Sequence, residues 1–154
     1  MVKAKEKTTV PIKLEGLCPT HARTDILVRD TETTIDEPLV RGGTNLGPSP
    51  TETMIAALAG CTNVISHKVA HKHGVEFQDF HVEVSCSFDR RGVLLEEEVD
   101  VPFDDVVIRI EVTTDADEAA MDKVKKDLPR FCAVSKVISQ SGAKVTEVWT
   151  INRP

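Results

Sequence analysis

Aromatic residues are scarce in this sequence, and long apolar runs are missing. Aromatic side chains make up 4% of the 154 residues, with one Trp and no Tyr, so the core has to come from aliphatic side chains. No stretch approaches the roughly 18 apolar residues that a membrane-spanning helix needs, and no apolar segment of the signal-peptide kind follows the charged N-terminus. The sequence therefore predicts a cytoplasmic protein without a membrane partner.

An excess of basic residues is missing as well. The formal net charge is -6, whereas a nucleic-acid-binding domain needs a basic face. Hydrophobic residues at 40% and charged residues at 29% are ordinary for a globular chain, and this length fits one domain. We therefore predict a single domain over residues 1–154 that has no nucleic-acid partner.

The cysteines lack the spacing of a zinc ribbon or a thioredoxin motif, because no two of them form a Cys-x-x-Cys pair. In a cytoplasmic protein, cysteines are more often catalytic or metal-binding than paired in structural disulfides. His67 and His71 stand four residues apart, a spacing that can bind zinc, but no Glu lies between them as in zinc proteases. We predict neither a metal nor another cofactor.

The strongest local signal is a long helix that begins at residues 49–52, which read Ser-Pro-Thr-Glu. A Ser cap, a Pro in the first helical position and a Glu two residues later form a capping box. Apolar residues then recur at helical spacing until Lys72, and Gly74 is a typical residue to end the helix. The small residues Ala56, Ala57, Ala59 and Gly60 make the middle of this helix slim on nearly every side, which predicts that it is buried.

The remaining pattern predicts strands before and after this helix. Residues 93–101 are ambiguous between an irregular excursion and a short helix. We expect strands at 8–15, 22–30, 33–36, 76–89, 104–114 and 143–152, and helices at 117–127 and 129–140, the last beginning at Pro129. This order predicts an α+β fold with meandering strands rather than alternating βαβ units.

Two of the four cysteines stand out by their context. Cys132 falls in the first turn of the predicted helix 129–140, where the helix dipole and Arg130 favour a thiolate. Cys61 lies about three turns into the slim helix, gains nothing from a dipole, and needs a cation from elsewhere. Because free cysteine often packs as a small hydrophobic residue, a purely structural role stays open for both. We expect Cys86 to lie in the core and Cys18 to be incidental.

Three segments resemble the signatures of one protein family. Residues 42–52 (Gly-Gly-Thr-Asn-Leu-Gly-Pro-Ser-Pro-Thr-Glu) and 56–62 (Ala-Ala-Leu-Ala-Gly-Cys-Thr) resemble the first signature of the OsmC/Ohr family, and residues 131–136 (Phe-Cys-Ala-Val-Ser-Lys) resemble the second. Ala133 stands where the family usually has Pro. The resemblance covers nearly the whole chain and implies an intertwined homodimer, with antiparallel sheets wrapped around a long buried central helix and active sites at the subunit interface.

The resemblance also implies a thiol-dependent peroxidase that acts in oxidative-stress defence. The Cys61 thiolate would attack the O–O bond of a hydroperoxide and become a sulfenic acid, which Cys132 would resolve as a disulfide. A small dithiol or a thioredoxin-like reductant would then restore both thiols. A resolving thiol protects the first cysteine from irreversible oxidation.

In the family an Arg and a Glu assist the first cysteine. Glu52 is the candidate Glu, although the hydroperoxide-resistance type carries its Glu one residue earlier, where this chain has Thr51. A capping role for Glu52 is the alternative. Arg41, beside the glycine-rich loop, is our first choice for the Arg and Arg29 our second, with a solvated surface charge as the alternative for each.

Two rival functions stay open. An OsmC-fold dimer could bind a small apolar ligand in its interfacial cavity, with the cysteines merely packing, and the slim helix suits this function equally well. A structural His/Cys metal site is the third hypothesis. The peroxidase differs from both in requiring a reactive Cys61 within disulfide reach of Cys132.

Overall fold

Helix α1 (Pro50–Lys72) is the longest element of the computed structural model, which describes residues 8–154. The predicted charged N-terminus, residues 1–7, lies outside the described residues. The chain divides into two compact units, one ending at Thr53 and the other comprising Met54–Pro154. One domain over the whole chain therefore stays a prediction, and the units are described separately.

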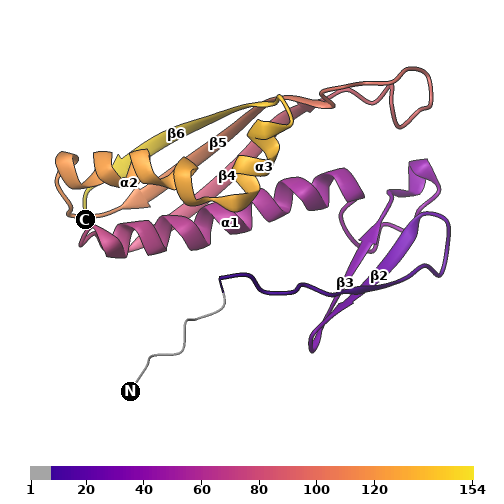
Figure 1. Cartoon of the computed structure of the whole chain (residues 1–154), viewed down its shortest axis with the longest axis horizontal. Helices are drawn as coiled ribbons and strands as arrows, with labels where there is room; N and C mark the ends of the chain where they lie inside the picture. Colours follow the sequence, from indigo (N-terminus) through magenta and orange to yellow (C-terminus); the bar gives the residue numbers. More distant parts are fainter. Residues whose placement is uncertain (1–7) are drawn as a thin grey trace. The chain divides into compact units, whose positions relative to one another are not determined.

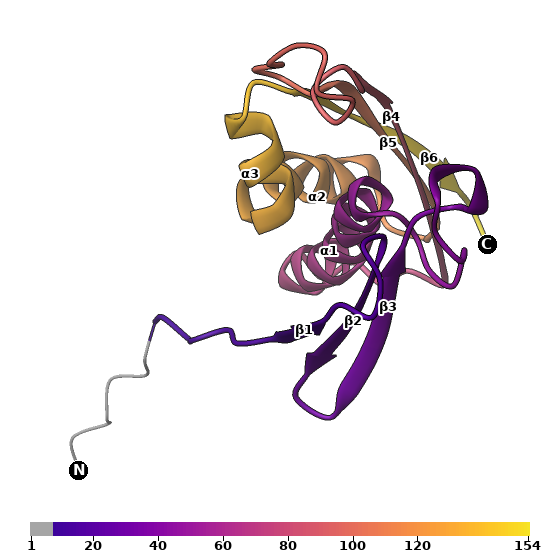
Figure 2. The same ribbon diagram turned by 90° about the vertical axis from the view of Figure 1, so that its right-hand side faces the viewer.

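The first unit contains a three-stranded antiparallel sheet with β2 in the centre (Figure 2). The strands predicted at 22–30 and 33–36 are confirmed with adjusted ends. Its elements are β1 (Glu15–Leu17), β2 (Arg23–Val28), β3 (Thr31–Asp36) and the short 3-10 helix η1 (Leu39–Arg41).

The strand predicted at 8–15 is wrong for most of its length. Only Glu15–Leu17 pairs with β2, and residues 8–14 have no regular structure. Pro11 cannot donate a backbone hydrogen bond there, so it does not support a ladder. The alternation survives as an exposed apolar row, because Val10, Ile12 and Leu14 are 75%, 84% and 56% exposed.

The second unit packs three helices onto one face of a three-stranded sheet (Figures 1 and 2). The central strand β5 buries Val106, Ile108, Ile110 and Val112, so the predicted alternation is confirmed. Residues 93–101 form turns and bends instead of a helix. The elements after α1 are β4 (Asp79–Phe88), β5 (Phe103–Thr113), α2 (Glu118–Phe131), α3 (Ala133–Gln140) and β6 (Lys144–Asn152).

One strand pair contradicts the expectation of purely antiparallel sheets. β4 and β5 are antiparallel, but β5 and β6 run parallel, with Val106 opposite Val145. The cause is the connection through residues 114–143, which forms two helices and returns the chain to the starting end of β5. Parallel neighbours need such a crossover, usually helical, whereas a hairpin turn joins antiparallel ones.

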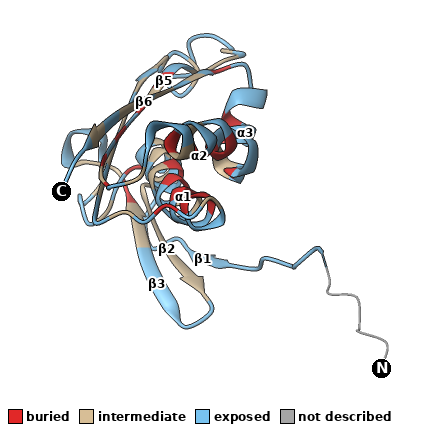
Figure 3. Cartoon of the chain, turned by 90° about the vertical axis from the view of Figure 1, so that its left-hand side faces the viewer, coloured by how far each residue is buried: buried red, intermediate tan, exposed pale blue. Residues whose placement is uncertain are grey.

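Helix α1 is buried on one side within this chain (Figure 3). The predicted burial of this helix therefore holds for only part of its surface in the single chain, because Ala56, Ala57 and Gly60 are exposed. A Cβ added at Gly60 would meet nothing within 4 Å. The buried residues of α1 are Leu58, Thr62, Ser66, Val69 and Ala70.

Both ends of α1 follow the prediction. At the start, Glu52 and Ser49 form the expected capping box, with the Glu52 carboxylate accepting from the Ser49 amide at 2.7 Å. At the end, Gly74 takes a φ of 69°, a left-handed conformation, and the Val75 amide donates to the Ala70 carbonyl at 2.9 Å. Local sequence thus determines where this helix begins and ends.

The predicted helix start at Pro129 is wrong. Pro129 lies inside the last turn of α2, and the next helix begins at Ala133. Leu128, which is 1% exposed in the core, and the bonded side chain of Asp127 hold this turn helical. Cys132 is consequently the junction between α2 and α3 rather than part of a first helical turn.

Among residues 8–154, none of the helices has the length and hydropathy that would be needed to cross a membrane.

Candidate active site

Cys61 and Cys132 come together in the second unit. Cys61 projects from α1 and is half-buried, while Cys132 at the α2–α3 junction is 1% exposed. Their sulfur atoms lie 2.9 Å apart as free thiols, with Cys132 donating to Cys61. A disulfide requires about 2.05 Å, so a small approach of the two sulfurs would join them.

Burial gives Cys132 the character of a protonated thiol. Removal from water, followed by the hydrogen bond to Cys61, raises the pKa of Cys132 to about 11. The amides of Val134 and Ser135 at the start of α3 lower this pKa only partly, and the Cys132 side chain makes no capping hydrogen bond. The expectation that the dipole favours a Cys132 thiolate is therefore wrong, because desolvation outweighs the dipole.

Arg130 does not offset this effect, because its charge is directed elsewhere. Its guanidinium donates to Asp127 at 2.7 Å and lies over the ring of Phe131, 5.5 Å from its centroid.

A hollow of about 430 Å³ begins one helical turn from Cys61. Ile65, Lys68 and Lys72 follow Cys61 by four, seven and eleven residues, which keeps them near one face of α1. Phe131, the residue before Cys132, forms another wall. The hollow therefore offers apolar walls and two ammonium groups; it is lined by Ile65, Lys68, Val69, Lys72 and Phe131.

Asp127 is the most heavily bonded side chain near the cysteine pair. Its carboxylate lies 3.1 Å from Lys72 Nζ, 3.0 Å from His73 Nε2 and 2.7 Å from Arg130 Nη1. The Asp127 side chain is 8% exposed. These partners, His73 and Lys72 foremost, lower the pKa of Asp127 far below its usual range. Asp127 was not predicted as a site residue, although it is the single acid among the cations of residues 123–130.

Glu52 belongs to the first unit, where it completes the capping box. Its carboxylate accepts from the backbone amide of Ser49 at 2.7 Å and from the Ser49 hydroxyl at 2.8 Å. These two bonds, with a smaller contribution from the charge of Arg41, lower the pKa of Glu52. The capping role is confirmed, and a chemical role stays a prediction.

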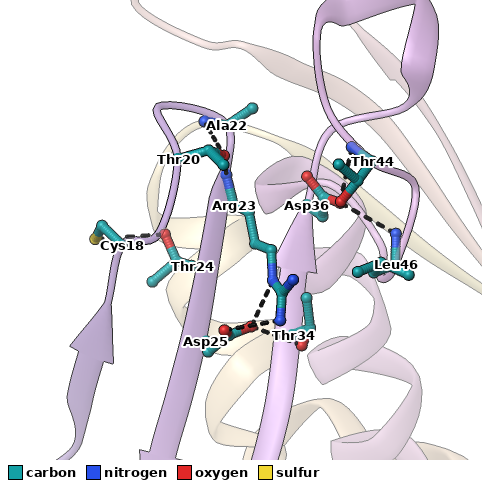
Figure 4. A network of polar contacts seen from close by, with 10 residues as sticks. All are labelled: Cys18, Thr20, Ala22, Arg23, Thr24, Asp25, Thr34, Asp36, Thr44 and Leu46. Atoms are coloured by element: carbon teal, nitrogen blue, oxygen red, sulfur yellow. Dashed lines mark hydrogen bonds and ion pairs between the residues drawn. The ribbon is translucent and has the colours of Figure 1, made fainter.

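The candidate arginines also lie in the first unit. Arg41 pairs with Glu37 at 2.7 Å, and Arg29 is exposed at the turn between β2 and β3 with a φ of 55°. Arg23, on β2, makes two bonds of 2.9 Å to Asp25 (Figure 4). Assistance to Cys61 by Arg41, or by Arg29 as the second choice, stays a prediction.

A buried Asp36 organises the glycine-rich loop of the first signature (Figure 4). Its carboxylate accepts from the Thr44 amide at 3.0 Å, the Thr44 hydroxyl at 2.6 Å and the Leu46 amide at 3.1 Å. A Cβ at Gly43 or Gly47 would lie 1.7 or 2.0 Å from a backbone oxygen. The glycines therefore allow close backbone packing, a structural role that the signature alone did not reveal.

The other cysteines differ from this pair. Cys86 packs against the core, and burial raises its pKa, as expected for a structural thiol. Cys18 is exposed, with its sulfur 3.8 Å from the Thr24 hydroxyl. Of the histidines considered for metal binding, His67 packs against the rings of Phe77 and Phe80.

Comparison with known sequences assigns the family. The profile of the OsmC-like protein family matches residues 43–148, a segment that contains both Cys61 and Cys132. The chain belongs to the OsmC-like protein family. A search of curated proteins found no match.

Solved structures of OsmC-like proteins share the fold. An OsmC-like protein from Mycoplasma pneumoniae superposes with a TM-score of 0.78 at 13% identity, covering 93% of this chain and 98% of the other. The organic hydroperoxide resistance protein OhrB of Bacillus subtilis superposes with a TM-score of 0.58 at 20% identity, covering 92% of this chain and 98% of the other. An organic hydroperoxide resistance protein OsmC from Legionella pneumophila superposes with a TM-score of 0.62 at 13% identity, covering 95% of this chain and 99% of the other. The predicted α+β, OsmC-like fold is confirmed.

Proposed function

We propose that this OsmC-like protein is a cysteine-based hydroperoxide reductase in oxidative-stress defence. Membership of the family, and neighbours described as organic hydroperoxide resistance proteins, support a peroxide-related role. The observation that carries the proposal is the 2.9 Å contact between the Cys61 and Cys132 sulfurs in the free-thiol state.

The contact between the two sulfurs supports Cys61 as the attacking cysteine and Cys132 as the resolving cysteine. Cys132 keeps its proton and donates it toward Cys61, so attack on the peroxide falls to Cys61. Cys61 is half-buried and lies one helical turn before Ile65, which lines the hollow, whereas Cys132 is almost completely covered. A buried thiol that waits beside the attacking sulfur suits the resolving step.

The reaction has three balanced steps. The Cys61 thiolate attacks the terminal oxygen, the O–O bond breaks, and the alkoxide takes a proton, giving a Cys61 sulfenic acid and an alcohol. The Cys132 thiol then attacks the Cys61 sulfur; the S–S bond forms, and the hydroxyl leaves with the thiol proton as water. Finally, a dithiol or thioredoxin-like reductant transfers two electrons and two protons to the disulfide and becomes oxidised itself.

The apolar walls of the hollow, which begins one helical turn from Cys61, favour organic hydroperoxides over hydrogen peroxide. Ile65, Val69 and Phe131 offer apolar contact to an alkyl or aryl group. Hydrogen peroxide has no such group and gains nothing from these walls. Discrimination should therefore appear in the rate of Cys61 oxidation.

A second copy of this chain is the partner that we propose. The row Val10, Ile12, Leu14 and the slim side of α1 at Gly60 are exposed in one chain. Apolar surface of this kind usually marks an interface, and a small residue such as Gly60 lets another backbone approach closely. An intertwined homodimer would cover both surfaces.

The decisive experiment counts free thiols by mass spectrometry after one equivalent of cumene hydroperoxide or hydrogen peroxide. We expect rapid loss of two thiols as a Cys61–Cys132 bridge, faster with cumene hydroperoxide. Cys61→Ser should abolish this reaction. Cys132→Ser should leave Cys61 as a sulfenic acid after one equivalent of peroxide, and a second equivalent should oxidise it further to sulfinic acid. Cys86→Ser, which removes another half-buried thiol, is the matched control and should react like wild type.

The proposal fails if Cys61 stays reduced while excess peroxide slowly oxidises only the exposed Cys18. In that case the binding of a small apolar ligand takes its place, because the same hollow suits such a ligand. Equilibrium binding of an alkylbenzene to the Cys61→Ser variant would then support that second function.

A further inference from the structure

We propose that Asp127 is a positioning residue that holds Cys132 against Cys61. It lies five residues before Cys132, in the last turns of α2, and its carboxylate binds the C-terminal end of α1, the helix that carries Cys61. A role for Asp127 in peroxide reduction rests on the proposed function, whereas its effect on how the two thiols meet does not.

The contacts join two helices through one carboxylate. Lys72 and His73, at the end of α1, approach Asp127 Oδ2 at 3.1 and 3.0 Å, while Arg130 binds Oδ1 at 2.7 Å. The Asp127 and His73 side chains are 8% and 18% exposed. A carboxylate so nearly buried and held by three partners has one orientation available.

The same cations also hold the residue next to Cys132. Lys72 Nζ lies 5.1 Å and Arg130 Cζ 5.5 Å from the centroid of the Phe131 ring. Phe131 is 49% exposed, so packing alone does not fix it. Lys72 and Arg130, which also bind Asp127, therefore connect this carboxylate to the residue immediately before Cys132.

The end of α2 needs such support because Pro129 interrupts its hydrogen bonding. A proline within a helix removes one backbone hydrogen bond and crowds the preceding turn. Two residues later α2 ends, and Cys132 takes extended dihedral angles of -72° and 104°. Asp127 anchors the last turn before this weak point.

Because α1 is one continuous helix, the position of its C-terminal end also sets the position of Cys61. Lys72 is eleven residues beyond Cys61, about 16 Å along the helix axis at 1.5 Å per residue. Fixing the end of α1 to the end of α2 therefore fixes the separation of the two sulfurs. Without Asp127, Cys132 should meet Cys61 less often, in the closure step that forms the disulfide.

The test closes the disulfide with diamide, which needs only proximity of the thiols. Diamide accepts two electrons and two protons from Cys61 and Cys132 as the S–S bond forms. Asp127→Asn should slow this closure about tenfold. It should also lower the equilibrium constant for disulfide formation in glutathione buffers about tenfold. The reduction potential of the disulfide would then be about 30 mV less negative.

Asp122→Asn is the matched control, because it makes the same change in the same helix. Asp122 pairs with Lys125, at 3.6 Å, and its side chain is 65% exposed. We expect its closure rate and the equilibrium constant of its disulfide in glutathione buffers to lie within about twofold of wild type. Lys72→Gln removes one exposed partner without leaving a buried charge alone, and should slow closure about threefold.

The proposal is overturned if Asp127→Asn matches Asp122→Asn in rate and potential, even when its melting temperature falls. If Asp127→Asn does not fold, Lys72→Gln decides by the same two readouts. The proposed function fails separately, when wild type closes with diamide but not with peroxide. Slow diamide closure in the variant then still supports positioning by Asp127.

Discussion

The two three-stranded sheets of this chain are stabilised in opposite ways. The sheet β4–β5–β6 has a continuous aliphatic core, with four side chains of β5 at 1% exposure or less. Among residues 8–53, by contrast, the fully covered side chains are the polar Asp36 and Ser49, and no aliphatic side chain is buried. The second unit can fold around its own core and holds both candidate catalytic thiols. The first unit has a buried polar network and exposes its apolar row, the surface that the proposed homodimer would cover.

The largest expected difference between the two units is in peroxide turnover when a cysteine of each is replaced. Cys61→Ser in the second unit should reduce peroxide turnover by roughly a thousandfold or more, because it removes the thiol that contacts Cys132. Cys18→Ser in the first unit should leave turnover unchanged. A coupled assay of peroxide consumption measures both, and strong loss in the Cys18 variant would contradict the assignment.

The next largest difference is in the free energy of unfolding. Ile108→Ala should cost about 3 kcal/mol, because Ile108 is 1% exposed and its loss leaves a cavity. Ile26→Ala, on the half-buried β2, should cost less than about 1 kcal/mol in the same urea titration. Equal losses would show that the first sheet has a core of comparable quality.

Self-association should depend on the apolar row of the first unit. Ile12→Glu places a charge on a side chain that is 84% exposed in one chain, and we expect the dimer dissociation constant to rise at least about tenfold. Val137→Glu on α3, where Val137 is 68% exposed, is the matched control. Sedimentation equilibrium measures both; no change with Ile12→Glu would remove the row from the interface.

Acid should loosen the first unit through Asp36. The hydroxyl of Thr44, more than any other group, lowers the pKa of Asp36. The ionised form therefore stabilises the fold above the unfolded pKa of about 3.9, and this stability is lost as the pH falls through the folded value. Hydrogen exchange should show the Leu46 amide losing protection between about pH 5 and pH 2, whereas in Asp36→Asn that loss should disappear. Constant protection in wild type would contradict this role.

The smallest effect has the opposite sign and lies in the second unit. Burial raises the pKa of Glu147, whose closest partner is Trp149 Nε1 at 3.3 Å. Its contribution to stability is present below the unfolded pKa and is lost as the pH rises through the folded value. Glu147→Gln should therefore stabilise the protein at pH 7 by a few tenths of a kcal/mol, since solvent screens a half-buried group. The gain in urea midpoint should vanish near pH 4.

Local sequence determined the elements whose signals are complete within a few residues. The capping box at Ser49 and Glu52 and the glycine at 74 set the ends of α1, because hydrogen bonds at helix ends involve near neighbours. Strict alternation placed β5 and its buried face. The family signatures around Cys61 and Cys132 indicated the fold from the sequence alone.

Tertiary structure alone decided how these elements meet. β6 lies parallel to β5 because two helices return the chain, and Pro129 stays helical because Leu128 and Asp127 are held by distant partners. Cys61 and Cys132, 71 residues apart, touch at 2.9 Å, and burial rather than the helix dipole sets the proton on Cys132. Desolvation and long-range contacts depend on what surrounds a residue in space, which neighbours in sequence do not specify.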